Sequence, residues 1–165
     1  MDLTVTRKEN KNQRVMCCVE ITSRGFSFVV SLLADNGQNQ VIVLERFESM
    51  VAAEISRKIK LVVEKYSLYG APCIVVLHPT DYNLFLIDKP NVAKNELQKA
   101  TKWVVKDMVQ YPLDQLVMDV FPSPHKHKLF VVATEQNLIE RIVDALGMVG
   151  LRLFKVTITE LAIMK

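Results

Sequence analysis

The 165-residue chain has little of several residue types: 7% aromatics, five glycines, three cysteines, one tryptophan and a net charge of only +3. Three cysteines form no complete disulfide framework, and Cys17, Cys18 and Cys73 lack the spacing of metal ligands. The small net charge argues against the concentrated basic face of a nucleic-acid-binding protein. No stretch reaches the roughly 18 consecutive apolar residues of a membrane helix. Disulfide scaffolds, disordered chains and membrane spans are therefore excluded.

Half of the residues are apolar. A chain of this length buries about 70% of its unfolded surface, so it can form a core without disulfides or metals. Residues 1–14 predict a solvated, weakly basic tail, and the polar segment 7–14 does not fit a secretory signal. These features favour the cytoplasm as the compartment.

The first half predicts a strand–strand–strand–helix–strand order. Turn-forming residues at Thr22–Gly25 and at 35–39 separate the first three strands, which favours an antiparallel meander. Ser49 can cap the helix, whose apolar residues recur at helical spacing until Gly70 and Pro72 end it. The expected strands are 15–21, 26–33, 41–44 and 73–77, and the helix runs through Val51, Ile55, Ile59, Val62 and Tyr66.

The second half predicts two strand–helix–strand units. The middle helix, 91–110, has an apolar stripe, and Trp103 lies one position off it, where the residue either packs in the core or receives a partner. Gly147 and Gly150 end the last helix. The expected strands are 82–87, 116–121, 129–133 and 151–158; the helices are 91–110 and 135–149; and the stripe consists of Leu97, Ala100, Val104 and Met108.

This order of elements is typical of an α/β protein with helices packed on a sheet, in which Tyr82–Phe121 forms an insertion. The lysines at 99, 102 and 106 fit a solvated helix face. Cys17 and Cys18 point to opposite faces of one strand, so at least one is a buried small hydrophobe, and no base that could activate a thiol is near in sequence.

Sequence motifs of catalysis are absent: there is no P-loop, dinucleotide fingerprint, nucleophile elbow or zinc-protease motif. His125 and His127 lie on one side of an extended segment, but without a third ligand they fit a solvated loop better than a metal site. Thr22, Ser23 and Gly25 are candidate phosphate-binding residues at a hairpin, with Glu20 and Arg24 beside them. An ordinary hairpin is the simpler interpretation.

Four segments together resemble the PilM-type pilus-assembly family. The first runs from Ala100 to Asp114 and contains Trp103, Asp107 and the step Tyr111-Pro112-Leu113-Asp114. The others are Val117-Met118-Asp119, Asp88-Lys89-Pro90 and the passage from Gly150 to Ala162. The sequence is similar in particular to the MshI-type members that serve mannose-sensitive haemagglutinin (MSHA) pili.

The resemblance implies an actin-like ATPase fold: a ribonuclease-H-like subdomain, 15–78 with 128–160, and an inserted strand–helix–strand–strand subdomain, 79–122. Residues 161–165 would begin a second half that holds part of the ATP cleft. Without that half, and with Glu20 in place of the expected acid pattern, the chain is expected to bind no cofactor.

The resemblance also implies a non-catalytic, cytoplasmic scaffold peripheral to the inner membrane. Such a scaffold docks the N-terminal tail of a bitopic pilus protein in a groove bordered by the two subdomains. Trp103, Asp107, Tyr111 and Leu113 are the candidate partner-binding residues. Two alternatives remain open: the cytoplasmic domain of a type II secretion component, and a nucleotide-hydrolysing actin-like ATPase that uses Thr22, Ser23 and Gly25.

Overall fold

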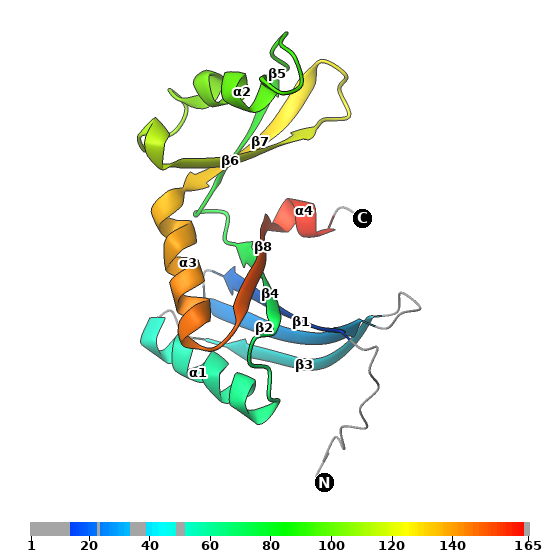
Figure 1. Ribbon diagram of the computed structural model, residues 1–165, viewed down its shortest axis with the longest axis vertical. Coiled ribbons are helices and arrows are strands. Elements are labelled where there is room, and N and C mark those ends of the chain that lie inside the picture. Colours follow the sequence, from blue (N-terminus) through cyan, green and yellow to red (C-terminus); the bar gives the residue numbers. More distant parts are fainter. Residues whose placement is uncertain (1–13, 23, 34–38, 49–51, 164–165) are drawn as a thin grey trace. The chain divides into compact units, whose positions relative to one another are not determined.

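The computed structural model describes residues 14–22, 24–33, 39–48 and 52–163 (Figure 1). They form two compact units. The first joins the described residues up to Val75 with Val149–Lys155, and the second joins Val76–Met148 with the described residues from Val156 onward. Ser23, Ser49 and nearly all of the expected tail lie outside the described residues. No helix in the described ranges is long and apolar enough to cross a membrane.

A five-stranded sheet dominates the first unit. Its order is β3-β2-β1-β4-β8, in which β1, β2 and β3 form the expected antiparallel meander. Inward-facing residues alternate along β1 and β2, where Cys17, Val19, Phe26, Phe28 and Val30 are buried. The strands are β1 (Arg14–Thr22), β2 (Gly25–Leu33), β3 (Asn39–Phe47), β4 (Pro72–Leu77) and β8 (Arg152–Ile158).

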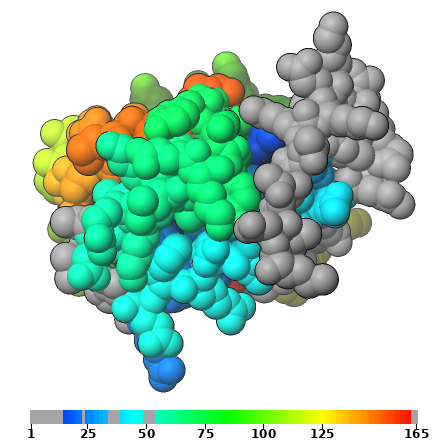
Figure 2. Space-filling model, turned by 90° about the horizontal axis from the view of Figure 1, so that it is seen from below, coloured from blue at the N-terminus to red at the C-terminus, as the bar shows by residue number. Residues whose placement is uncertain are grey.

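Helix α1 (Ala52–Lys65) supplies the other side of the first unit's core. Ile59, Val62 and Val63 are buried at the helical spacing that the sequence indicates. Figure 2 looks onto this unit from the side of α1, whose outer surface faces the viewer beside that of β3. The helix ends in a turn where Ser67 and Gly70 have positive φ, followed by Pro72.

A separate three-stranded sheet forms the centre of the second unit. Its order is β5-β7-β6, and both pairs are antiparallel. Its strands are β5 (Asn83–Asp88), β6 (Leu116–Pro122) and β7 (Lys128–Glu135). The strand at 129–133 is expected in the ribonuclease-H-like subdomain, whereas in the structure it pairs with β5 and β6. The short 123–127 connection explains this, because it favours hairpin pairing of β6 with β7.

Helix α2 (Leu97–Val105) covers one face of this sheet and is shorter than the expected helix at 91–110. Residues 91–96 instead form turns, in which the Glu96 N–H donates to the Ala93 carbonyl. The expected stripe is also wrong in part, since Val104 and Met108 are each 47% exposed. The prediction holds for Leu97, which packs against the core, and Thr101 and Val105 take the next core-facing positions at spacings of four residues.

The core of the second unit lies between α2 and the sheet. It consists of Ile87, Val105, Leu116, Leu129, Val131 and Ala133. Later in the chain, α3 (Gln136–Met148) buries Ile142 and Leu146, whereas Val143, which the sequence places on the same face, is 46% exposed. Two short helices, η1 (Leu113–Gln115) and α4 (Thr159–Ile163), are not expected from the sequence.

Candidate functional site

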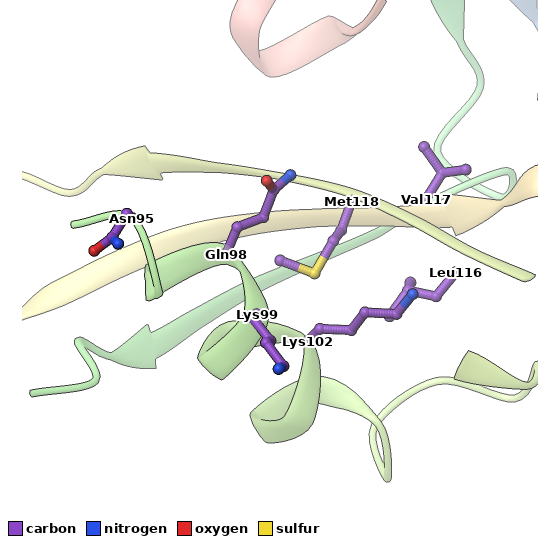
Figure 3. A pocket seen from close by; sticks show the side chains of 7 residues that line it. All are labelled: Asn95, Gln98, Lys99, Lys102, Leu116, Val117 and Met118. Atoms are coloured by element: carbon purple, nitrogen blue, oxygen red, sulfur yellow. The ribbon is translucent and has the colours of Figure 1, made fainter. Parts of the chain in front are cut away.

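An open hollow of about 490 Å³ lies between α2 and β6 in the second unit (Figure 3). One wall is polar and basic, and the other is apolar. In Figure 3, Gln98 and Lys102 extend from α2 beside Met118 and Leu116, whereas Lys99 points away from the strand. The lining residues are Asn95, Gln98, Lys99, Lys102, Leu116, Val117 and Met118.

Strand β6 is an edge strand. Within its sheet it pairs only with β7, with register Leu116 opposite Glu135 and Pro122 opposite Leu129. An edge strand keeps a row of backbone N–H and C=O groups without a neighbouring strand, and such a row can receive an extended segment of another chain. The hollow therefore combines a free strand edge with a helix wall.

The charged side chains on the polar wall of the hollow are both positive. Lys99 and Lys102 both line it, and none of its lining residues is acidic. One helical turn further along, the Lys106 ammonium lies 5.4 Å from the centre of the Trp103 ring and 4.0 Å from the Asp107 carboxylate. Side chains with acidic groups are therefore favoured at this site, although exposed ion pairs each contribute little.

The four residues that the resemblance assigns to partner binding separate into two pairs. Trp103 is 57% exposed, and Asp107 is also exposed. Tyr111 and Leu113 are partly buried and pack against the core of their own unit. A role in partner binding remains a prediction for all four, and the packing of Tyr111 and Leu113 leaves less of their side chains open to a partner.

Tyr111 illustrates that packing role. Its hydroxyl oxygen is buried and makes no hydrogen bond in the described part of the chain. Burial raises the pKa of Tyr111, the Asn83 side chain opposes the shift, and the charge of Glu135 adds to it. A neutral, buried phenol suits a structural position better than a catalytic one.

The hairpin between β1 and β2 holds the remaining phosphate-binding candidates. The Thr22 hydroxyl donates to the Gly25 carbonyl at 3.1 Å and accepts from the Arg24 N–H at 3.4 Å. The hydroxyl is thus engaged within the turn. A hollow of about 300 Å³ beside the turn is lined by Arg24 and Arg46 but also by the carboxylates Glu20 and Glu48. Among the described residues that line this hollow, two arginines are balanced by two carboxylates, which leaves no surplus of positive charge for a phosphate.

The cysteines are structural. Cys17 and Cys73 are fully buried, which confirms that at least one of the neighbouring pair Cys17–Cys18 serves as a small hydrophobe. Burial, and secondarily the neighbouring Cys18 thiol, raises the pKa of Cys17 to about 12. Burial also raises the pKa of Cys18 and Cys73. Thiols with such raised pKa values are poor nucleophiles and poor metal ligands at neutral pH.

Across the described ranges, no three His, Cys, Asp or Glu residues gather closely enough to hold a metal ion. His125 and His127 are both exposed on the loop between β6 and β7. The His127 carbonyl accepts a hydrogen bond from the Lys89 N–H, and the His125 carbonyl accepts one from the Lys128 N–H. These residues shape the β6–β7 connection.

The hollow between α2 and β6 is not predicted from the sequence. Lys99 and Lys102 are expected there only as part of a solvated helix face, and Gln98 and the edge of β6 carry no recognisable sequence signal. The signal was present in part, because two lysines three residues apart share a helix face. What the sequence could not supply was which strand would lie beside that face and be left at the sheet edge.

No protein-family model matches the chain, and no curated protein matches it by sequence. The solved structures that are similar to it include two at 16% identity. The cytoplasmic domain of EpsL, an inner-membrane component of the type II secretion system of Vibrio cholerae, matches with a TM-score of 0.68 over 92% of this chain. A chain of the PilM–PilN type IV pilus biogenesis complex matches with a TM-score of 0.74 over 90% of it.

These similarities confirm the predicted fold class, an α/β protein with a ribonuclease-H-like (actin-like) fold. This chain spans 60% of the EpsL domain and 48% of the matched chain of the PilM–PilN complex. At 16% identity the likeness establishes the fold alone.

Proposed function

We propose that this chain is a non-catalytic docking scaffold of an inner-membrane assembly platform of the type IV pilus or type II secretion kind. It lies on the cytoplasmic side and captures the extended N-terminal tail of a bitopic membrane protein. The observation that carries the proposal is the hollow in which the unpaired edge of β6 runs beside α2. The shared fold with a chain of a PilM–PilN complex supports it.

The chemistry of the hollow indicates the kind of peptide that would bind. Backbone groups along β6 can pair with an extended segment, while the apolar wall of Leu116, Val117 and Met118 receives alternate side chains. Lys99 and Lys102 favour an acidic residue on the same segment. The proposed ligand is therefore an extended peptide with apolar residues and at least one acid.

Within this proposal, the MSHA pilus is the preferred system, on the strength of the sequence resemblance around Trp103, Asp107 and Tyr111. The type II secretion alternative has its own support, because the EpsL cytoplasmic domain shares the fold over 92% of this chain. The genes that flank the coding sequence distinguish the two systems directly.

The test is a titration of the full chain into a fluorescently labelled peptide of the partner's cytoplasmic N-terminal tail, followed by anisotropy. We expect saturable binding, weakened about fivefold to tenfold by Lys102→Glu, since a reversed charge in the hollow repels an acidic ligand. Lys126→Glu is the matched control, because Lys126 is equally a lysine of the second unit but lies on the exposed β6–β7 loop. Its binding should stay within about twofold of the wild type.

Two results would count against the proposal. One is the absence of saturable binding at high micromolar peptide. The other is an equal loss of affinity in Lys102→Glu and Lys126→Glu, which would place the peptide elsewhere and leave only a general charge effect.

A further inference from the structure

Strand β6 presents only alternate residues to its free edge. The Lys89 N–H donates to the His127 carbonyl and so continues the β5–β7 ladder by one residue. The odd-numbered residues of β7 therefore point their backbone groups toward β5, and the even-numbered ones point toward β6. Because Val132 of β7 lies opposite Asp119 of β6, the odd-numbered residues of β6 bond to β7 and the even-numbered ones face outward.

Most of the outward positions of β6 have no N–H to offer another strand. These positions are Leu116, Met118, Val120 and Pro122. The Leu116 N–H donates to the Leu113 carbonyl of η1. The Val120 N–H donates to the Asp119 carboxylate, with the nitrogen 2.8 Å from Oδ1. Pro122 has no N–H, and its place on an edge strand with the nitrogen facing outward is the usual one for proline in a sheet.

Met118 is the outward position that remains open. In the part of the chain that the structure describes, no group accepts a hydrogen bond from its N–H. The hollow is lined by Leu116, Val117 and Met118 of β6 but by neither Asp119 nor Val120. The accessible stretch of the strand edge therefore ends where the Asp119 carboxylate caps the backbone.

The Asp119 carboxylate opposes an added strand in two ways. In an antiparallel addition, the peptide residue opposite Val120 would offer its carbonyl oxygen to the Val120 N–H. That donor is already engaged, and the carboxylate oxygen that engages it would repel the incoming carbonyl oxygen. The peptide residue opposite Met118, by contrast, can exchange both backbone hydrogen bonds with it.

We propose that Asp119 sets the register and the length of the strand that β6 accepts. It confines full backbone pairing to the one peptide residue opposite Met118, so that the bound peptide leaves the β conformation beside Val120. This inference rests on the proposed peptide docking and names the residue that decides its register. Charged residues and prolines on edge strands also prevent unwanted strand pairing. In β6 they leave one position open, and that position fixes where the peptide binds.

Amide hydrogen exchange of the full chain, followed residue by residue by NMR, tests the cap without any ligand. After correction for intrinsic rates, the Val120 amide should exchange about fivefold more slowly than the Met118 amide, because one hydrogen bond protects it. Asp119→Ala should remove this difference. Asp119→Asn should keep it, because the side-chain oxygen of asparagine also accepts a hydrogen bond.

Peptide binding tests the consequence of the cap. The probe is a fluorescently labelled synthetic peptide in which valines alternate with serines and one glutamate, and binding is followed by anisotropy. Asp119→Ala should bind it about fivefold more tightly than Asp119→Asn, because the freed Val120 N–H gains a partner. Both variants lack the same charge, so a general charge effect cancels. Saturation with the peptide should slow exchange at Met118 but not at Val120 in the wild type, and at both amides in Asp119→Ala.

The outcomes separate this inference from the docking on which it rests. Equal exchange of the Val120 and Met118 amides in the free wild type would overturn the cap. Equal affinities of Asp119→Ala and Asp119→Asn for a peptide that the wild type binds would overturn the inference alone and leave docking standing. An absence of saturable binding in the wild type and in both variants would overturn docking on β6, and the inference with it.

Discussion

Tyr82 and Glu160 show how a single pair of residues ties distant parts of the chain together. The Tyr82 hydroxyl donates to the Glu160 carboxylate at 2.5 Å, which links the start of β5 to α4 across 78 positions of sequence. Tyr82 is 8% exposed, whereas Glu160 is exposed. Burial first, then the hydrogen bond and the charge of Glu160, raise the pKa of Tyr82 to about 12.

This raised pKa predicts a loss of stability at alkaline pH. The unfolded tyrosine has a pKa near 10.0, so the folded state holds the proton more tightly than the unfolded chain does. The contribution is complete below pH 10 and is lost as the pH rises from about 10 to 12. Tyr82→Phe should lower the free energy of unfolding by about 1 kcal/mol at neutral pH.

Urea unfolding of the wild type and of Tyr82→Phe, at pH 8 and at several values above 10, checks this prediction. The difference in unfolding free energy between the two proteins should shrink as the pH rises. Because all other groups titrate alike in both proteins, a difference that stays constant through pH 12 would contradict the role of this hydroxyl.

At the scale of elements, α3 ends at a position that only glycine suits. Gly150 has φ of +81°, and its carbonyl accepts a hydrogen bond from the Gly70 N–H at 2.7 Å. A Cβ added to Gly150 would lie 2.6 Å from Cδ1 of the Tyr69 ring. Gly147, by contrast, lies inside α3, and a Cβ there would meet no atom within 4 Å.

The two glycines form a matched pair for mutation to alanine. Gly150→Ala should lower the free energy of unfolding by about 1–2 kcal/mol, mainly through backbone strain, since the exposed Tyr69 ring can move aside. Gly147→Ala should raise it by about 0.5–1 kcal/mol, because alanine is the better helix former. Thermal or urea unfolding of both variants measures these changes. A change in unfolding free energy of the same sign in both variants would contradict the assigned backbone roles.

The buried face of helix α2 differs from the face that the sequence predicts. Counting apolar residues favours a stripe through Ala100, Val104 and Met108, yet the buried positions are taken by Thr101 and Val105. A threonine at a core position carries no apolar signal in the sequence, and its hydroxyl finds no partner in the described residues. The rotation of the helix, and with it the exposure of Trp103, was set by packing against β6 and β7.

In the molecule as a whole, the fold is actin-like, and the charges at the described residues of the first hairpin bear on whether it can bind a nucleotide. The Thr22 hydroxyl is engaged with the Gly25 carbonyl, and two carboxylates share the adjoining hollow with two arginines. We therefore expect that Mg-ATP does not stabilise this chain.

Differential scanning fluorimetry with and without millimolar Mg-ATP checks this expectation. A ligand at a hundred times its dissociation constant adds about 2.7 kcal/mol to the free energy of unfolding. For a chain of this size that corresponds to a rise in Tm of about 5–10 °C. A rise of that size, absent with Mg-AMP, would contradict the non-nucleotide assignment and support the ATPase alternative.

Elements with local signals can be read from the residues alone. The meander follows from turn residues at Thr22–Gly25, α1 follows from its apolar spacing, and β4 follows from a continuous apolar run, so these could be predicted. Three features depend on long-range packing: β7 joins β5 and β6, β6 lies at the sheet edge, and Trp103 is exposed. The alternation of apolar residues predicts which face of a strand is buried. It does not predict which strand lies beside it, because strand pairing depends on contacts between residues far apart in sequence.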